Sequence, residues 1–589
     1  MFKALAVVKR CLALFAHDER KNLYFLTAIV AAMSLVELIG VVSILPFMSV
    51  VTNPESIISN KFLFNTYQYF NFQTETGFLL FLGGFALAAL VIGNSVRALS
   101  SYMLVKFSQM QNHHLGTRIL NNYLSQPYEY YLKTNSSDLI KIVLDEVSQF
   151  INSIVQPMLK GFARCCTAIF LIAMLVFVNP KVAIIMGLVL GTCYLVLYQL
   201  LKKRISSLGK QRVQFNRQRY RIISEVSGGI KEVKLMNHEE TYLSEFDNPS
   251  EGYAITQSYN SLIGELPKYA LEVVAFGGIL STVMYLIATQ GQAQAISLTA
   301  LYAFAGYKLM PALQEIFSSV NKVKFSLPVL KLVEESLHAN EQIIKSTFTE
   351  DAKLAFTKGL ELKNVYFQYA NTDSQTLKNI NLEIKANSTV GIKGPTGSGK
   401  TTLIDIILGL LIPSQGKILI DGVEISSENL RAWQQQIGYV PQSIYLLDNT
   451  IAANIAFGIP EKERNLEKIK MAANLAQIST FIETELPKSY QTQVGERGVR
   501  LSGGQRQRIG IARALYHDPS LLVFDEATSA LDHETEKAVM ESIEKLAGKK
   551  TILMIAHRLS TLAGVDQVVE LNNGELTYSK KEEAGETYA

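Results

Sequence analysis

The sequence predicts two unlike parts: an α-helical membrane domain of six spans with long cytoplasmic helix extensions, followed by an α/β domain with a phosphate-binding loop. A chain of 589 residues is too long for one hydrophobic core. Its apolar residues concentrate before Val320, and Gly394–Thr401 has the pattern G-x-x-x-x-G-K-T. We expect the membrane domain in residues 1–324, a polar linker in 325–358 and the α/β domain in 359–589.

Composition favours a protein that lies in a lipid bilayer. Hydrophobic residues make up 48% of the chain, and the mean hydropathy is +0.16. The formal net charge of +4 is small for this length and indicates no nucleic-acid partner. The cysteines lie in apolar or membrane-flanking stretches without metal-ligand spacing, so we interpret them as small packing residues: Cys11, Cys165, Cys166 and Cys193.

The N-terminus does not read as a cleavable signal peptide. The polar stretch His17–Lys21 interrupts a short apolar run, and no small-residue cleavage site follows. Residues 2–16 instead predict an amphipathic helix on the inner membrane face. Its basic residues Lys3, Lys9 and Arg10 would then point toward lipid headgroups.

Six segments are long and apolar enough to cross a bilayer, which takes about 20 residues each. They are Leu23–Val51, Gly77–Val105, Met158–Val178, Lys181–Leu201, Leu266–Thr289 and Ile296–Val320. The loop 202–250 carries ten Lys and Arg residues, whereas the loop 52–76 has only Lys61. Since basic loops stay on the inner side, we expect both termini and the α/β domain in the cytoplasm.

The connections 106–157 and 202–265 keep helical periodicity without membrane-level hydrophobicity. They predict helices that continue about 30 Å or more into the cytoplasm. Two breaks in them, Lys133–Asp138 and Asn237–Glu240, could contact the α/β domain. The alternative is that both breaks are solvated helical turns.

From Gly359 onward, short apolar strands alternate with helices. The expected strands are Val365–Tyr369, Val390–Lys393, Leu521–Phe524 and Thr551–Ala556, and the expected helix is Thr401–Leu411. The loop before this helix therefore joins a buried strand to a helix N-terminus. Free N–H groups and the helix dipole favour phosphates at such a position.

The loop and a second strand end predict the chemistry of a nucleotide and Mg²⁺. The loop residues that would cradle the phosphates are Gly394, Pro395, Thr396, Gly397, Ser398, Gly399 and Thr402. Lys400 would reach the β- and γ-phosphates, and Thr401 with Asp525 would hold Mg²⁺. Glu526 is placed to polarise a water molecule that attacks the γ-phosphate.

The stretch Leu501–Gln505 reads LSGGQ and follows the phosphate-binding loop in the same domain. Together the two motifs resemble the ATP-binding cassette (ABC) exporter family, and the match in order and spacing extends over residues 359–589. The resemblance implies ATP as the nucleotide. It also implies roles for Tyr369 on adenine, Gln442 near Mg²⁺ and His557 on the γ-phosphate. Taken singly, Tyr369 would more often be a strand-edge aromatic and His557 a surface histidine.

The same resemblance implies a homodimer. Ser502, Gly503, Gly504 and Gln505 would meet the ATP held by a second copy, because the chain has one phosphate-binding loop and one LSGGQ motif. Asp532 matches a loop at that dimer contact. Val494–Gly498 matches an exporter loop that contacts the two helix breaks, which stand where the family has coupling helices.

Charged residues inside the predicted spans point to the cargo, because an intramembrane charge is costly. They are Glu37, Arg97, Arg164, Lys268 and Lys308. One interpretation is internal pairing of Lys268 with Glu272 and of Lys308 with Glu37. The other is a cavity with cations at several heights, which would suit a phosphate-bearing lipid headgroup and which a purely hydrophobic drug would not need.

Parts of the membrane domain look like the lipid-linked oligosaccharide flippase of bacterial N-glycosylation. They are Val36–Glu37, Leu45–Met48, Val96–Leu99 and Lys308–Pro311. This resemblance implies a bacterial inner membrane, a polyprenyl-diphosphate-linked glycan or similar glycolipid as cargo, and a short external helix within residues 58–70. Arg97 matches the family pattern, whereas Lys268 and Lys308 replace arginine. The alternatives are export of lipid A core, a phospholipid or a hydrophobic drug, an importer on the same fold, or an ATPase-coupled scaffold.

Overall fold

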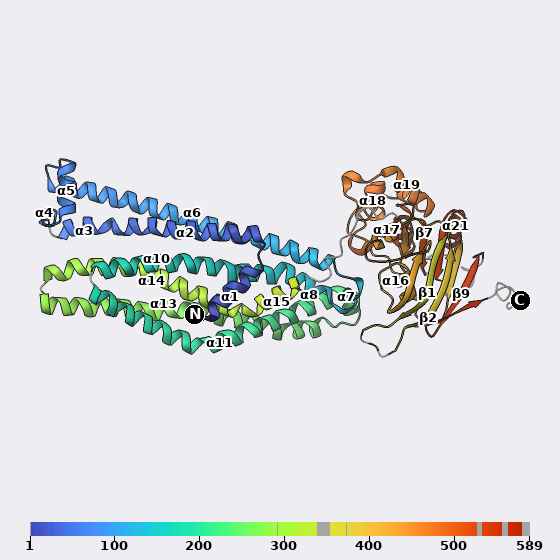
Figure 1. Cartoon of the computed structure of the whole chain (residues 1–589), viewed down its shortest axis with the longest axis horizontal. Coiled ribbons are helices and arrows are strands. Elements are labelled where there is room, and N and C mark those ends of the chain that lie inside the picture. Colours follow the sequence, from blue (N-terminus) through green and yellow to red (C-terminus); the bar gives the residue numbers. More distant parts are fainter. Residues whose placement is uncertain are drawn as a thin grey trace. The chain divides into compact units, whose positions relative to one another are not determined.

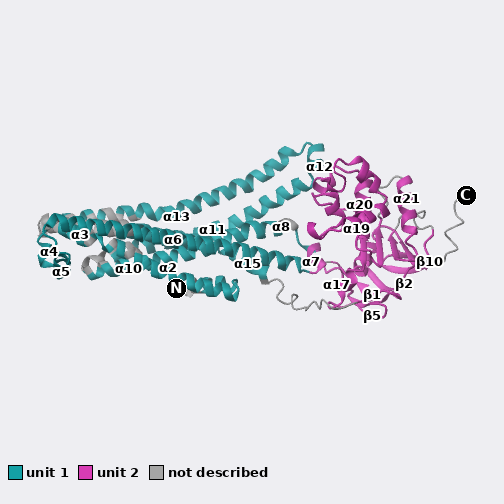
Figure 2. Cartoon of the chain, turned by 90° about the horizontal axis from the view of Figure 1, so that it is seen from above, with its two compact units in different colours: residues 1–126, 133–341 teal, residues 127–132, 342–589 magenta. Residues whose placement is uncertain are grey.

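The computed structural model describes residues 2–338, 354–526, 533–555 and 564–579, apart from Asn53, Asn179, Gly291, Asn371 and Asp373. For some helical residues, Glu37 and Lys308 among them, the description covers the backbone alone. The chain divides into two compact units (Figure 2). The first comprises residues 1–126 and 133–341, and the second comprises residues 127–132 and 342–589.

The described part of the first unit is helical (Figure 1). Its main helices are α1 (Phe2–Ala13), α2 (His17–Val42), α3 (Ile44–Thr52), α6 (Glu75–Leu124), α10 (Gln156–Val178), α11 (Pro180–Gly228), α13 (Glu239–Gln290), α14 (Gln292–Phe325) and α15 (Leu327–His338). Shorter pieces are α4 (Ser56–Ser59), α5 (Lys61–Tyr69), α7 (Tyr128–Lys133), α8 (Ser136–Ile140), α9 (Val147–Phe150) and α12 (Ile230–Leu235). Two π-helical stretches, η1 (Lys141–Glu146) and η2 (Ile151–Val155), flank α9.

The long helices pack side by side. Helix α2 packs against α6 and α10, α10 against α14, and α13 against both α11 and α14. Helices α6, α11 and α13 have 50, 49 and 52 residues, so each is roughly 75 Å long at about 1.5 Å per residue. This length exceeds the hydrocarbon core of a bilayer, about 30 Å, and confirms that these helices continue beyond their predicted spans.

The count of six membrane spans is not confirmed. All six predicted segments lie in helical residues, although the first is broken at Ser43 between α2 and α3. Among the described residues, only Glu75–Leu124 and Asp138–Met174 are long and apolar enough to cross a membrane by length and composition. Six spans therefore remain a prediction.

The two ends of the helical unit differ in detail from expectation. Helices α4 and α5 confirm a helix within residues 58–70, and Asn60 caps α5 by accepting a bond from the Phe62 N–H at 3.0 Å. Helix α1 is present, but the expectation that Arg10 points to lipid headgroups is wrong. Its guanidinium bonds both carboxylate oxygens of Glu334 on α15, with Nε 2.9 Å from Oε1.

A protein-facing apolar surface explains this orientation of α1. Cys11 and the following Leu14 and Phe15 are buried in a core that includes Val329 and Leu330 of α15. Burying these side chains against protein brings the polar rim of α1 beside α15. The first part of the expected linker is thus a packed helix of the first unit, and residues 339–353 lie outside the described residues.

The second unit contains two sheets (Figure 1). One is six-stranded, in the order β10 (Glu575–Ser579), β9 (Gln567–Asn572), β3 (Thr389–Lys393), β8 (Thr551–Ile555), β7 (Leu521–Asp525) and β6 (Ile437–Val440). The other is antiparallel, in the order β2 (Leu377–Lys385), β1 (Gly359–Phe367), β4 (Gln415–Ile420) and β5 (Val423–Glu424). The helices that concern the site are α16 (Lys400–Ile407), α17 (Leu430–Gln434), α18 (Ile451–Ile455), α19 (Leu466–Leu475), α20 (Gly503–Leu515) and α21 (His533–Glu544).

The parallel pairing of β3, β8, β7 and β6 places the carboxyl ends of these strands along one edge of the sheet. One apolar core joins both sheets with α16 and includes Leu403, Ile404 and the fully buried Trp433. The predicted strands are present, with β1 ending at Phe367 rather than Tyr369. The strand edge therefore presents the residues that follow β3 and β7 to one common region.

Candidate functional site

The loop between β3 and α16 has a backbone that suits a bound phosphate. Gly397 and Gly399 have φ angles of +82° and +103°, which side-chain-bearing residues rarely adopt. A Cβ on Gly399 would also lie 3.1 Å from the backbone carbonyl oxygen of Thr376, so the positive φ and this close backbone favour glycine there. The loop thus wraps tightly at the N-terminus of α16, where backbone N–H groups remain available for an anion.

Polar side chains of the same loop also fit phosphate. Lys400 is buried, and its Nζ donates to the carbonyl oxygens of Gly394 at 2.8 Å and Pro395 at 2.9 Å. The hydroxyl of Ser398 is buried and has no hydrogen-bond partner among the described residues. A phosphate oxygen is an acceptor that would satisfy both groups.

Asp525 and Glu526 follow each other at the end of β7, which is separated in the sheet from β3, the strand before this loop, by β8 alone. Asp525 is buried. Glu526 has a φ of +50°, a costly conformation for a residue with a side chain. In this conformation its N–H donates to the carbonyl of Ile555 at 3.2 Å, and its Oε2 accepts a bond of 2.7 Å from Nε2 of Gln442. The fold therefore joins the predicted base to the predicted loop glutamine.

Three acidic side chains, Asp405, Asp525 and Glu526, lie near the end of β7. Burial raises the pKa of Asp525, and the neighbouring Glu526 adds to the rise. Burial also raises the pKa of Asp405 on α16 to about 6, with Asp525 contributing. The Tyr439 hydroxyl donates to Oδ2 of Asp525 at 3.4 Å. A divalent cation would relieve this accumulation of negative charge.

Sequence reasoning missed Asp405 and Tyr439. Tyr439 pairs with Val523 across the parallel strands β6 and β7, so its closeness to Asp525 follows from strand order. Asp405 lies one helical turn after Thr401, on the helix that starts at the phosphate-binding loop. An acidic residue one turn into that helix was a readable signal, whereas the strand neighbour depends on topology.

Tyr369 and Thr402 form a second contact near the loop. The Tyr369 hydroxyl lies 3.1 Å from Oγ1 of Thr402, and the Tyr369 ring packs edge-on against Phe367 at 5.0 Å. Thr402 is buried, and Tyr369 is partly exposed. The aromatic side chain is thus held beside the helix that begins the phosphate-binding site.

The LSGGQ motif begins helix α20. Ser502 is the N-cap: its hydroxyl accepts from the Gln505 N–H at 3.2 Å, and its own N–H donates to Oε1 of Gln505 at 2.8 Å. This reciprocal capping box fixes the start of a helix of 13 residues. Gly503 and Gly504 occupy its first turn, where N–H groups are unpaired within the helix. The sequence predicts that Ser502 opens a helix, as observed, but it did not predict the capping box with Gln505.

Two predicted residues, Asp532 and His557, lie outside the described residues. The predicted break at Lys133–Asp138 is present, because helix α7 ends at Lys133 and α8 begins at Ser136. The preceding segment Pro127–Leu132 groups with the second unit, and Tyr128 packs on the apolar core that contains α16. The second break matches expectation, because Asn237 adopts a φ of +57° between α12 and α13.

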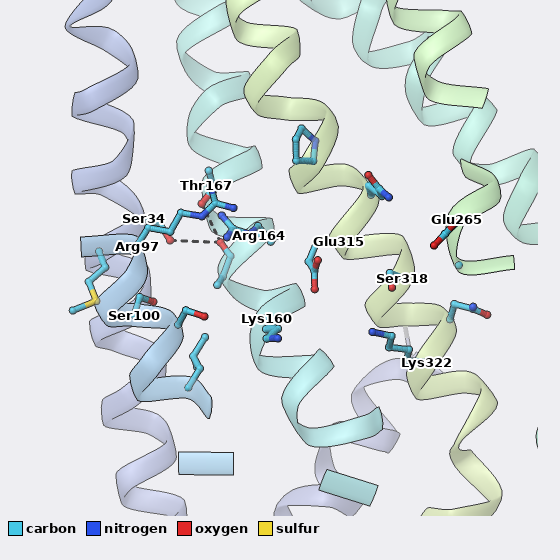
Figure 3. A pocket seen from close by; sticks show the side chains of 18 of the residues that line it. Ser34, Arg97, Ser100, Lys160, Arg164, Thr167, Glu265, Glu315, Ser318 and Lys322 are labelled. Atoms are coloured by element: carbon cyan, nitrogen blue, oxygen red, sulfur yellow. Dashed lines mark hydrogen bonds between the residues drawn. The ribbon is translucent and has the colours of Figure 1, made fainter. Parts of the chain in front are cut away.

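A separate cavity of about 570 Å³ lies among helices of the first unit. Its lining comes from α2, α6, α10, α13 and α14. Figure 3 shows Arg97, Lys160 and Arg164 on one side, and Glu265, Glu315, Ser318 and Lys322 on the other. Ser34 and Thr167 both donate to the carbonyl of Ala163, at 3.5 and 3.3 Å (Figure 3). The cavity is therefore strongly polar within otherwise apolar helices.

The residues predicted to contact the cargo differ in whether they line this cavity. Arg97 lines the cavity, and so does Arg164. Lys268 is exposed on α13, does not line it among the described residues, and makes no ion pair with Glu272. The side chains of Glu37 on α2 and Lys308 on α14 are not described.

Sequence reasoning missed several lining residues: Lys160, Asn260, Glu265, Glu315, Asn321 and Lys322. A signal was present on α14. Gln314, Ser318, Asn321 and Lys322 recur three or four positions apart, which places them on one helical face. A polar stripe that begins inside a predicted apolar span and continues past its end is a readable sign of a cavity wall.

Comparisons with known proteins identify the family of both domains. Residues 377–529 match the family described as ABC transporter, and residues 22–311 match the ABC transporter transmembrane region. The chain is 31% identical over 481 residues to an ATP-dependent lipid A-core flippase of Pseudomonas fluorescens, with 81% of this chain and 78% of the relative covered. A lipid A-core flippase of Ralstonia nicotianae is 28% identical over 497 residues, with 81% and 80% covered.

The fold also has a solved counterpart. A bacterial Atm1-family ABC exporter with ATP bound superposes with a TM-score of 0.75 at 21% identity, covering 94% of this chain and 95% of that chain. These relatives are named lipid A-core flippases, not the lipid-linked oligosaccharide flippase that parts of the membrane domain resemble. The resemblance to the ABC exporter family is confirmed. The chain belongs to the ABC transporter family, as an exporter whose ATPase domain hydrolyses ATP to drive transport across a membrane.

Proposed function

We propose that a homodimer of this chain uses ATP and Mg²⁺ to flip a phosphate-bearing glycolipid across a bacterial inner membrane. The observation that carries the proposal is the cationic side of the cavity. Arg97 on α6 and Lys160 and Arg164 on α10 line one volume of about 570 Å³. Phosphate groups form charge-assisted hydrogen bonds with guanidinium and ammonium groups, and these bonds are about twice as strong as neutral ones.

Two glycolipids fit this chemistry. Lipid A and a polyprenyl-diphosphate-linked oligosaccharide both carry phosphate beside sugars. The names of the relatives favour lipid A core, and the resemblance around Val36–Glu37 and Val96–Leu99 favours the oligosaccharide lipid. We propose the shared class, with the lipid-linked oligosaccharide as the first candidate and lipid A as the second.

The proposed ATPase chemistry follows from the residues around the phosphate-binding loop. Lys400 and the loop N–H groups would bind the β- and γ-phosphates. Thr401, Gln442 and Asp525 would hold Mg²⁺, which supplies positive charge to the phosphate oxygens. Glu526 would orient the attacking water, held in place by Gln442. We expect Tyr369 to stack on adenine and His557 to contact the γ-phosphate.

The homodimer is part of the proposal because each chain carries one phosphate-binding loop and one LSGGQ motif. The capping box leaves the first-turn N–H groups of α20 directed out of the helix start. An ATP molecule from a second copy is the anion that we expect there.

Flipping in proteoliposomes tests the proposal. The full chain is reconstituted with a fluorescent polyprenyl-diphosphate oligosaccharide, with fluorescent lipid A, or with fluorescent phosphatidylcholine. The triple variant Arg97→Gln, Lys160→Gln, Arg164→Gln should flip the two phosphate glycolipids at least about tenfold more slowly, because several charge-assisted contacts are lost. Its basal ATPase should persist.

The matched control is Lys203→Gln, which removes an exposed cation of α11 outside the cavity. It should flip both glycolipids at the wild-type rate. Unchanged flipping by a well-folded triple variant, or flipping of phosphatidylcholine alone, would reject a phosphate glycolipid as cargo. Preference for one of the two glycolipids would decide between them.

A further inference from the structure

The two sides of the cavity differ in chemistry. The side formed by α6 and α10 presents three cations, Arg97, Lys160 and Arg164. The side formed by α13 and α14 presents the carboxylates Glu265 and Glu315 together with Lys322 (Figure 3). Hence one wall is a donor surface for phosphate, and the other is a mixed surface rich in acceptors.

The carboxylates of the second wall are not used to neutralise protein cations. In the part of the chain that the structure describes, neither Glu265 nor Glu315 forms an ion pair or a side-chain hydrogen bond. Glu265 is exposed and Glu315 is partly buried, and both line the cavity. A carboxylate that faces a ligand cavity disfavours a purely anionic headgroup, because like charges repel.

A second observation on the same wall points to a donor in the ligand. Asn321 lies on α14, after Glu315 by about 1.7 helical turns, and only 2% of it is exposed. Its Nδ2 donates to the carbonyl of Asn260 at 3.3 Å, but its Oδ1 has no partner among the described residues. Oδ1 of Asn260, on the cavity lining from α13, is also buried without a partner. Buried acceptors without donors are costly, and a ligand N–H group would satisfy them.

From this arrangement we infer that the transported lipid has a headgroup with both a phosphate and a protonated primary amine. The phosphate lies against Arg97, Lys160 and Arg164. The ammonium lies against Glu265 and Glu315, with Asn321 Oδ1 as a further acceptor. The inference rests on the proposed function and narrows it, since an amine-free phosphate lipid leaves the second wall unmatched.

An amine on the headgroup has two chemical sources, an amino sugar or an ethanolamine attached to phosphate. Three lipids with the same acyl chains separate them: unmodified lipid A, lipid A carrying phosphoethanolamine, and lipid A carrying 4-amino-4-deoxyarabinose. Equilibrium binding of each to the full chain in nanodiscs is the measurement. The wild type should bind at least one amine-bearing lipid about fivefold more tightly than unmodified lipid A, as expected for two partly exposed ion pairs.

The double variant Glu265→Gln, Glu315→Gln should lose this preference because it binds the amine-bearing lipids more weakly, while its affinity for unmodified lipid A should stay the same or rise as the repulsion of phosphate is relieved. Glu251→Gln is the matched control, because Glu251 is an exposed carboxylate on α13 outside the cavity lining. It should keep the preference. If the double variant is not recovered as a monodisperse protein, each single variant should lose part of the preference.

Equal binding of the three lipids by the wild type would overturn the inference. A double variant that keeps the preference would also overturn it, as would one that gains affinity for all three lipids equally, since its carboxylates would then merely repel phosphate. If the wild type prefers only one of the two amine-bearing lipids, that lipid shows whether the amine of the cargo belongs to an amino sugar or to a phosphate-linked ethanolamine. A different result would reject the proposed function itself: the triple variant Arg97→Gln, Lys160→Gln, Arg164→Gln would bind unmodified lipid A as tightly as the wild type does.

Discussion

The guanidinium of Arg212 on α11 lies 2.8 Å from Oε2 of Glu146 in the π-helical stretch η1, and both side chains are almost fully buried. Asn216 completes the arrangement by donating to the other Glu146 oxygen at 3.3 Å. The Tyr253 ring of α13 lies 5.7 Å from the Arg212 guanidinium. This pair therefore ties three segments of the helical unit together, and its residues are 66 positions apart in sequence.

Breaking this pair should destabilise the helical unit strongly. Glu146→Gln removes the nearer, buried counter-charge of Arg212 and leaves only the partly exposed Asp145 at 3.6 Å, so the loss should approach the roughly 3–5 kcal/mol of a broken buried pair. Replacing both residues together, as Arg212→Met with Glu146→Met, should cost less than the single change, because no charge stays buried. Denaturant unfolding of the purified chain in detergent measures both.

Arg221→Met is the control for this prediction. Arg221 pairs with Glu225 on the same helix at 3.4 Å, and both side chains are exposed. Such a surface pair contributes about 0–1 kcal/mol. A loss for Glu146→Gln no larger than that for Arg221→Met would show that the buried pair does not hold the helices together.

Glu526→Gln should separate ATP binding from hydrolysis. A glutamine at this position can still accept the bond from Gln442 through its amide oxygen, so the local geometry persists. The carboxylate that we propose to orient the attacking water is lost, and ATPase should fall by about 10²-fold or more. Phosphate release and nucleotide binding by the same preparation are the measurements. Turnover within about threefold of the wild type would reject Glu526 as the base, given typical general-base effects.

Ser502 caps helix α20, and we propose that it also contacts the ATP held by a partner copy. Aspartate and asparagine cap helices about as well as serine. Ser502→Asp should therefore keep thermal stability but lose ATPase at least about tenfold, because its charge repels phosphate by about 1.4 kcal/mol or more. Ser502→Asn is the neutral control and should retain most activity. Normal ATPase in Ser502→Asp would argue against a shared site in the homodimer.

Asp405 predicts a specific pH dependence for the second unit. Its pKa is raised to about 6 by burial and by Asp525. The folded protein therefore holds a proton that the unfolded chain has released above about pH 4, and stability falls as pH rises through about 6. Asp405→Asn, without nucleotide or Mg²⁺, should be more stable than the wild type at about pH 7.5, and the advantage should shrink toward about pH 5.

Thermal unfolding across this pH range is the measurement, with Asp448→Asn as the control for removal of an exposed carboxyl. An advantage for Asp405→Asn that grows as pH falls would have the wrong sign. The same advantage in both variants would mean that the loss of any negative charge, rather than the burial of Asp405, accounts for it.

The sequence by itself determined the features whose physics is local. The loop at Gly394–Thr401 needs its glycines at positive φ and its lysine at the helix start, and these positions are consecutive in the chain. The strand before it and the helix after it follow from apolar patterning. The order of the phosphate-binding loop, LSGGQ and Asp525–Glu526 identified the family for the same reason, because each motif is complete within a few residues.

Tertiary structure alone decided the contacts between distant segments. Lys160, Glu265 and Glu315 line one cavity only because α10 and α13 each pack against α14 with particular faces inward. Arg10 pairs with Glu334 rather than with lipid headgroups because α1 packs its apolar face against α15. Helical periodicity fixes which residues share a face, but the rotation of one helix against another depends on side-chain packing summed over the whole interface. That sum is a property of all the helices together, so no single segment of the sequence contains it.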